Sequence, residues 1–224
     1  MSSNTQKATL QRRPLVKKIL EGADDNLLVI AGLGSSNWDI TEAGDRPLNM
    51  PLWGSMGAPV GMGLGLALAQ PKKRVLVITG DGDMLMSLGS LATVAAQQPD
   101  NLAIVVLDNE KFGETGNQAT HTSPLNNGPT DSGAGTDLAM IARGCGIADT
   151  GTVRDASEVA ALVKDVRTRK GPVFRLVKVM VEKLELVMPP QDGAHLKDRF
   201  RQATSMIWAA IWVRGRRPRM PLAI

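Results

Sequence analysis

Short apolar runs alternate with helical segments along most of this chain. Clear runs that predict buried strands occupy residues 27–34, 75–82 and 102–109, and weaker ones occupy 151–155 and 172–181. Helices are predicted around and between them at residues 12–21, 58–69, 84–97, 136–145 and 156–169. Strands that are apolar on both faces and alternate with helices predict an α/β fold, with one doubly wound parallel sheet covered by helices on both faces.

The same pattern predicts one domain with two extensions. We expect residues 1–11 to form a flexible N-terminus, residues 12–200 the domain, and residues 201–224 a C-terminal tail of unknown structure. Residues 113–135 are rich in Gly, Asn, Ser, Thr and Pro and lack periodicity, which is typical of a functional or mobile loop. The tail contains MIWAAIW, which is too short to cross a bilayer.

Composition narrows the class of protein further. The 224 residues are 43% hydrophobic and 21% charged, values typical of a soluble globular protein. Only 3% are aromatic and none is tyrosine, which argues against base-stacking nucleic-acid sites. The net charge of +4 reflects arginines in the last 24 residues, so a basic recognition face on the domain is not expected.

Cysteine use and hydropathy predict a location. The single Cys145 excludes an internal disulfide and argues against a cysteine-rich metal or iron–sulfur site. No apolar core of a secretory signal and no membrane-spanning run is evident, so we expect the cytoplasm.

Polar residues follow three of the predicted strands directly. They are the segments Gly34-Ser35-Ser36, Gly80-Asp81-Gly82-Asp83 and Asp108-Asn109. The carboxyl ends of parallel strands share one edge of a sheet, where ligands of such folds bind. Asp81 and Asn109, 28 positions apart, offer the hard oxygens that Mg²⁺ prefers, and the glycines allow phosphates to approach the backbone. The pattern predicts a magnesium and diphosphate site.

These motifs resemble the diphosphate-binding domain of thiamine-diphosphate-dependent enzymes. Gly-Asp-Gly followed at this distance by Asn109 is the signature of that domain. The segment DRPLNMPLWGSMGAPVGMGLGLALA resembles the part of these enzymes that receives the pyrimidine ring of the cofactor. Together with GETGNQATH, these motifs look most like the β subunits of sulfopyruvate and phosphonopyruvate decarboxylases, over residues 12–200.

The resemblance implies a role for individual residues. Asp81 and Asn109 would bind Mg²⁺ through their side chains, and Lys111 through its main-chain carbonyl. The diphosphate would be surrounded by Ser35, Ser36, Gly80, Gly82, Asp83, Gly113 and Glu114.

A second group would contact the rest of the cofactor. The carbonyl of Gly54 would accept from the pyrimidine amino group, with Ser55 beside it, and Met56 would hold the cofactor bent. His121 is a candidate for catalysis or anion binding, with a solvated loop histidine as the alternative. Core packing is the alternative for Met56, and helix capping for Ser35 and Ser36.

The resemblance also implies that this chain is half of an active site. In the family a glutamate from a separate pyrimidine-binding domain activates the cofactor. No glutamate here matches that motif, and no length remains for a second domain. We therefore expect a 2-oxo acid decarboxylase, a carboxy-lyase, that is active only with an α-type partner subunit and is at least dimeric.

Three other functions are considered. GMGLGLALA superficially resembles a dinucleotide-binding fingerprint, but its glycine spacing is wrong and no strand precedes it. An acetolactate-synthase-like carboligase subunit and a non-catalytic cofactor-binding or structural subunit stay open.

Overall fold

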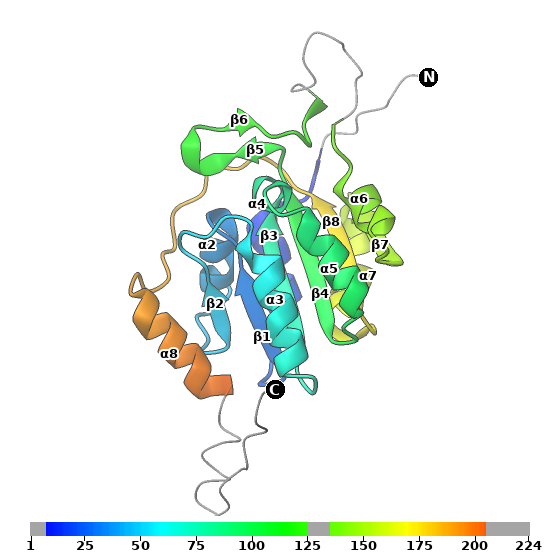
Figure 1. Cartoon of the computed structure of the whole chain (residues 1–224). Helices are drawn as coiled ribbons and strands as arrows, with labels where there is room; N and C mark the ends of the chain where they lie inside the picture. The colour runs from blue at the N-terminus through cyan, green and yellow to red at the C-terminus, as the bar shows by residue number, and fades with distance from the viewer. Residues whose placement is uncertain (1–7, 125–134, 205–224) are drawn as a thin grey trace, which may run out of the picture.

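The chain folds around one all-parallel sheet. The computed structural model describes residues 8–124 and 135–204. Six strands pair in the order β2-β1-β3-β4-β8-β7 (Figure 1). Their bounds are β1 Leu27–Ala31, β2 Asn49–Pro51, β3 Arg74–Gly80, β4 Leu102–Asp108, β7 Asp149–Val153 and β8 Val173–Lys178. The order changes direction at β1, which has β2 on one side and β3 on the other. The predicted doubly wound α/β fold is confirmed.

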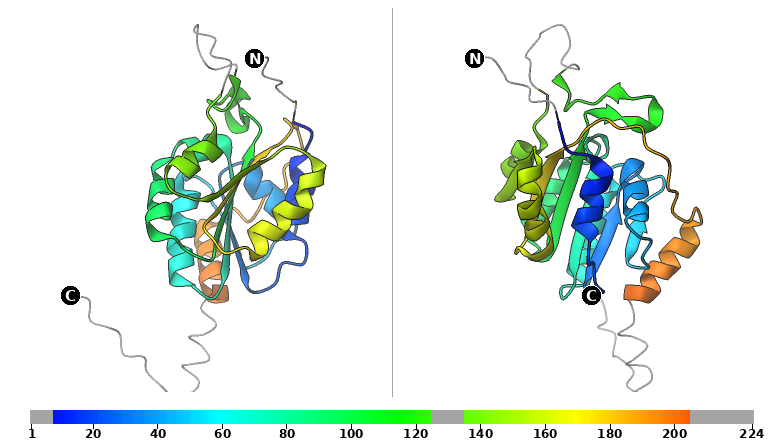
Figure 2. Two further views of the ribbon diagram at one scale, coloured as in Figure 1. Left: turned by 90° about the vertical axis from the view of Figure 1, so that its right-hand side faces the viewer. Right: turned by 180° about the vertical axis from the view of Figure 1, so that it is seen from behind.

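Helices cover both faces of the sheet. One face carries α3 (Ala58–Ala69), α5 (Gly89–Gln97) and α6 (Leu138–Gly144) (Figure 1). The opposite face carries α1 (Arg12–Leu20), α2 (Ser35–Glu42) and α7 (Val159–Thr168), seen from behind in Figure 2. Within the described residues, the other elements are α4 (Asp81–Leu85), α8 (Gly193–Thr204), β5 (Lys111–Phe112), β6 (Gln118–Ala119) and the 3₁₀ turns η1 (Gly113–Thr115) and η3 (Ala156–Glu158).

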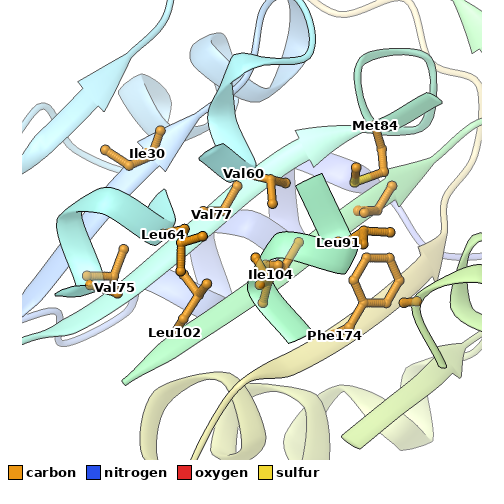
Figure 3. Close-up of a cluster of buried hydrophobic side chains, with 14 of the residues drawn as sticks. Ile30, Val60, Leu64, Val75, Val77, Met84, Leu91, Leu102, Ile104 and Phe174 are labelled. Atoms are coloured by element: carbon orange, nitrogen blue, oxygen red, sulfur yellow. The ribbon is translucent and has the colours of Figure 1, made fainter. Parts of the chain in front are cut away.

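Strand alternation divides the core into two layers. Successive strand residues point to opposite faces of a sheet. In β3, Val75 and Val77 accordingly join the layer under α3 and α5, which Figure 3 shows, while Leu76 and Ile78 join the layer under α1 and α7. All four are fully buried. Each central strand is therefore apolar on both faces, as the continuous apolar runs predict.

The predicted single helix at 84–97 is wrong. Two helices, α4 and α5, are separated by turn residues 86–88. This turn packs against Gly57, which has a φ of +82°; a Cβ at Gly57 would lie 3.2 Å from the Cβ of Ser87 and 3.3 Å from the main-chain oxygen of Met86. The break lets the loop before α3 approach the end of β3.

Several elements lack a counterpart in the prediction. The helices α2 and α8 and the short strand β2 were not predicted. The segment 113–135, expected to be irregular, contributes β6, which pairs antiparallel with β5 over the carboxyl ends of the central strands (Figure 1).

Both ends of the described chain are attached to the domain. Leu10 is buried and forms a parallel bridge with Val179. At the other end, α8 continues through Thr204 and buries Leu196 and Phe200. The MIWAAIW segment lies outside the described residues. Within those residues, no helix is long and apolar enough to cross a membrane.

Helix α3 approaches β3 closely at one glycine, which generates a prediction. A Cβ at Gly63 would lie 2.3 Å from Cγ2 of the buried Val77, whereas a Cβ at Gly65 would meet nothing within 4 Å. Gly63→Ala is therefore expected to lower the free energy of unfolding by about 1–3 kcal/mol through overpacking. The matched control Gly65→Ala is expected to raise it by about 0.5–1 kcal/mol through helix propensity. Urea unfolding of the full chain measures both; equal effects of the two substitutions would contradict the close approach.

Candidate functional site

A cavity lies at the carboxyl ends of β1, β3 and β4. It has a volume of about 100 Å³, below the roughly 300–1,000 Å³ of pockets that enclose a whole small ligand. Its lining comes from the N-terminus of α1, the turn into α2, the loop before α3, the turn into α4 and the β5–β6 region. The lining residues are Arg12, Leu33, Gly34, Ser35, Ser36, Met56, Gly80, Asp81, Gly82, Asp83, Leu107, Asn109, Lys111, Phe112, Gly113, Glu114 and Thr115.

Strand register brings the acidic residues of two motifs together. Gly80 of β3 pairs with Leu107 of β4, so Asp81 and Asp108 follow at the same level of the sheet. Both carboxylates are buried, with 1% relative exposure each. Burial, and then the charge of Asp108, raise the pKa of Asp81 from 3.8 to about 6.

Two threonines from the segment after β6 hold Asp81. The hydroxyls of Thr120 and Thr122 lie 2.5 Å and 3.0 Å from Oδ2 of Asp81. The Thr122 hydroxyl also lies 2.8 Å from Oδ1 of Asp108. Because a hydroxyl carries one proton, Thr122 can donate to only one of the two carboxylates at a time. Asp81 is thus fixed in place but incompletely compensated.

Asp108 is compensated by a lysine instead. Lys178, its register partner in β8, places Nζ 2.8 Å from Oδ2 of Asp108 and 2.7 Å from Oε1 of Glu110. The main-chain amide of Glu110 donates to Oδ1 of Asp108 at 3.1 Å. Asp108 therefore supports the end of β4, while Asp81 faces the cavity.

The three residues expected to bind Mg²⁺ line this one cavity. Oδ1 of Asn109 accepts from the amide of Lys111 at 3.0 Å, which fixes the carboxamide. A carbonyl oxygen has a second lone pair, so this bond leaves Asn109 able to bind a cation. No group of three or more His, Cys, Asp or Glu side chains in the described part of the chain could hold a metal. A cation here would depend on one carboxylate, amide and main-chain oxygens, and oxygens of a ligand.

Asp83 holds the loop that carries Met56. Its carboxylate accepts from the hydroxyl of Thr79 and from the amide of Gly57, and burial raises its pKa. The carboxylate occupies the space beside Gly32, where a Cβ would lie 2.0 Å from Oδ2. Through Gly57, the turn after β3 is tied to Met56, which lines the cavity and is 37% exposed.

Two further glycines admit neighbouring side chains. A Cβ at Gly82 would lie 2.4 Å from the ring of Phe112. One at Gly34, which has a φ of +83°, would lie 3.0 Å from Oε1 of Glu114. The β5 and η1 residues therefore lie directly against the turns that follow β1 and β3.

The sequence candidates divide into two groups. Those brought together in the cavity are Ser35, Ser36, Met56, Gly80, Asp81, Gly82, Asp83, Asn109, Lys111, Gly113 and Glu114. Gly54, Ser55 and His121 are exposed and do not line it, although Gly54 and Ser55 lie in the same loop as Met56.

Sequence reasoning missed Arg12, Thr120 and Thr122. The two threonines lie in a turn, in which the amide of Ser123 donates to the main-chain oxygen of Thr120 at 3.1 Å, so no strand periodicity marks them in the sequence. Arg12 lies in an ordinary amphipathic helix, and nothing in its local sequence marks it as a site residue.

The comparisons with known proteins agree with the geometry. The family model described as "Thiamine pyrophosphate enzyme, C-terminal TPP binding domain" matches residues 33–177. The sulfopyruvate decarboxylase subunit beta of Methanocaldococcus jannaschii is 38% identical over 150 residues, covering 66% of this chain and 72% of that protein.

Two longer proteins match over part of their length. The phosphonopyruvate decarboxylase of Streptomyces hygroscopicus is 30% identical over 81% of this chain but only 43% of its own length. The crystal structure of benzoylformate decarboxylase from Polynucleobacter necessarius superposes with a TM-score of 0.62 at 18% identity, over 83% of this chain and 36% of that one, and shares the fold. With most of its length matched by the family model and the β subunit, this chain belongs to the thiamine pyrophosphate enzymes as a C-terminal TPP binding domain.

Proposed function

We propose that this chain is the thiamine-diphosphate- and magnesium-binding subunit of a 2-oxo acid decarboxylase, active together with an α-type partner subunit. Relatives named sulfopyruvate and phosphonopyruvate decarboxylases support a 2-oxo acid that carries a second acidic group. The observation that carries the proposal is the convergence of Asp81, Asn109 and Lys111 with Ser35 and Ser36 in one cavity.

The oxygen ligands and hydrogen-bond donors that line the cavity suit a diphosphate bound through Mg²⁺. Asp81 and Asn109 offer the carboxylate and carbonyl oxygens that suit Mg²⁺, which commonly takes one or two protein side chains together with phosphate oxygens. The hydroxyls of Ser35 and Ser36 can donate to phosphate oxygens. Gly80 is half-buried, and a Cβ there would meet nothing within 4 Å, so a phosphate can approach its backbone.

The remaining residues would orient the reactive part of the cofactor. The chemistry that thiamine diphosphate supplies when bound is an electron sink for the loss of CO2 from a 2-oxo acid. Met56 would support the cofactor from one side, held in place through Gly57 and Asp83. The Gly54 carbonyl, in the same loop, would accept a hydrogen bond from the pyrimidine.

Two observations support the need for a partner. The S. hygroscopicus relative leaves more than half of its length unmatched, whereas the M. jannaschii relative is named a subunit. In the described residues, Glu114 is the only glutamate that lines the cavity, and its carboxylate lies against Gly34, in the turn into α2. The acid that activates the pyrimidine is therefore assigned to the partner.

Helix α3 offers a surface for that partner. Its twelve residues, APVGMGLGLALA, include no polar side chain, and Gly61, Met62, Gly65 and Leu68 are exposed. An exposed helix face without polar residues is unusual in a monomer and favours a protein contact. Helix α3 begins at Ala58, two residues after Met56 of the cavity lining, so a subunit bound to this face would lie beside the cavity.

Removal of the proposed metal ligand tests the binding site. Asp81→Ala is expected to weaken the binding of thiamine diphosphate in the presence of Mg²⁺ by about 100-fold or more. Loss of a residue that only supports a metal ligand costs about 10- to 100-fold in metal affinity, and loss of a ligand itself should cost at least as much. Asp155→Ala, at an exposed cap outside the cavity, is the matched control and is expected to bind like the wild type. Calorimetric titration measures both affinities, and an unchanged affinity of Asp81→Ala would end the metal assignment.

The pKa of Asp81 generates a stability prediction. Folding of the metal-free chain raises this pKa from 3.8 to about 6. The contribution of Asp81 to the free energy of unfolding therefore falls as pH rises from about 4 to about 6, and it stays low at higher pH. Asp81→Asn lacks this loss. Above pH 6 it is expected to exceed the wild type in free energy of unfolding by on the order of 2 kcal/mol, with little difference below pH 4.

Urea unfolding in the presence of a chelator measures this difference at both ends of the pH interval. Excess Mg²⁺ and thiamine diphosphate should reverse the order by stabilising only the wild type. A difference that does not depend on pH would contradict the buried, charged state of Asp81.

Reconstitution tests the half-site. The purified chain is expected to release no CO2 from sulfopyruvate or phosphonopyruvate above background. The complex with its α-type subunit should do so, and the same complex carrying Asp81→Ala should not. Turnover by the purified chain alone would refute the requirement for a partner.

A further inference from the structure

Arg12 is a buried cation in the wall of the cavity. It begins α1, is 4% exposed, and lines the cavity together with Ser35 and Ser36. Its main-chain amide donates to Oε2 of Glu182 at 2.8 Å, which fixes the start of the helix. Arginine is almost never buried without a charged partner, so the groups around its guanidinium decide what it can bind.

Asp39 of α2 holds the guanidinium of Arg12. Nε of Arg12 donates to Oδ2 of Asp39, and Nη2 lies 3.5 Å from Oδ1. Arg13 binds the same carboxylate from Nε at 3.2 Å. Asp39 is fully buried, so one buried negative charge lies between two positive ones. The three side chains together carry one excess positive charge.

Part of the Arg12 guanidinium is available to a ligand. A guanidinium has five N–H donors, and Asp39 receives two of those of Arg12. No other hydrogen bond from this guanidinium falls within residues 8–124 and 135–204. Arg13 differs, because its Nη2 donates to the main-chain oxygen of Glu185 at 2.7 Å and its side chain does not line the cavity.

The charges of the cavity indicate which ligand Arg12 meets. The lining carboxylates are Asp81, Asp83 and Glu114, and the lining cations are Arg12 and Lys111. A diphosphate bound through Mg²⁺ at Asp81 still has anionic oxygens that need donors. Ser35 and Ser36 begin α2, where main-chain amides and the helix dipole favour an anion. A guanidinium presents N–H groups in the planar arrangement that suits phosphate oxygens.

We propose that Arg12, oriented by Asp39, binds an anionic oxygen of the cofactor's diphosphate. This inference rests on the proposed function. Asp39 is a positioning residue, because it contacts Arg12 and does not line the cavity. The first turn of α1 is thereby part of the diphosphate site, although it lies far in sequence from the Gly-Asp-Gly and Asn109 motifs.

Calorimetric titration of the full chain with thiamine diphosphate and Mg²⁺ tests this contact. Arg12→Met is expected to lower the affinity by about 10- to 100-fold, the range for a hydrogen bond to a charged group. Arg12→Lys should lower the affinity less, because lysine keeps the positive charge and loses only the planar set of N–H donors. Arg13→Met is the matched control and should leave the affinity unchanged.

The controls separate binding from folding. In Arg12→Met and in Arg13→Met one arginine still pairs with Asp39, so neither variant leaves that buried carboxylate uncompensated. Thermal unfolding of the ligand-free chain should therefore change by similar amounts in both. If Arg12→Met does not fold, an affinity of Arg12→Lys equal to that of the wild type overturns the proposal and a reduced affinity supports it.

A second probe identifies the ligand group. Inorganic pyrophosphate with Mg²⁺ should compete with thiamine diphosphate in the wild type, and more weakly in Arg12→Met. Unchanged affinities for both probes would overturn the contact and leave Arg12 as a link between α1 and α2. If Arg12→Met had unchanged affinities, and the enzyme reconstituted with this variant showed only a raised KM for its acidic substrate, the result would indicate that the guanidinium binds the substrate and not the diphosphate.

Failure of this inference differs from failure of the proposed function. A wild-type chain that does not bind thiamine diphosphate and Mg²⁺ would contradict the function. A wild-type chain that binds them, with Arg12→Met binding equally well, would contradict only the role of Arg12.

Discussion

The parallel register of β1, β3 and β4 is the constraint on which the site depends. Ala31 pairs with Ile78 and Gly80 pairs with Leu107, so the three strands end within a few residues of one another. Chain segments that leave these strands must turn at the same edge. Ser35, Asp81 and Asn109 lie 46 and 28 positions apart in the sequence, and they converge because of that register.

This convergence brings the carboxylates of Asp81 and Asp108 close together, and the repulsion between their negative charges is unfavourable in the folded chain without a cation. Asp81 and Asp108 are both buried and share the hydroxyl of Thr122, and only Asp108 has a lysine against it. The arrangement favours a cation beside Asp81 at some cost to the chain alone. Because Thr120 and Thr122 belong to the segment after β6, a cation at Asp81 would also influence the position of that segment.

Most of the fold follows from hydropathy, since buried parallel strands produce continuous apolar runs. The pattern fails where local sequence is overruled by tertiary packing. Residues 84–97 read as one helix, but the approach of Gly57 requires a turn at 86–88. Strand β2 has only three residues, and β5 and β6 two each, which is too short for periodicity to reveal. In α8, Leu196 and Phe200 have helical spacing, but the segment lies beyond the last predicted strand.

The site residues also fall into those that local sequence predicts and those that depend on tertiary contacts. Asp81 and Asn109 stand in a recognisable spacing next to strong strands, so sequence alone indicates them. Asp39, Arg12 and Lys178 act through contacts between elements distant in sequence, with ion pairs spanning 27 residues in one case and 70 in the other. The local sequence pattern cannot predict such pairs, because each partner alone is an ordinary polar residue of a helix or strand.

The crossover after β8 has a consequence for how the domain can be shortened. Residues 179–192 run without helix or strand from one side of the sheet to α8 beside β2, as the view from behind in Figure 2 shows. On the way, Glu182 and Glu185 bond to the start of α1, and the main-chain oxygen of Pro190 accepts from the indole of Trp53 at 3.1 Å. A protein ending after β8 would retain its whole sheet and yet lose the brace that joins its first helix to the Met56 loop. Shortening the domain to its sheet would thus also remove the buried Leu196 and Phe200 of α8, together with the contacts that hold the Met56 loop.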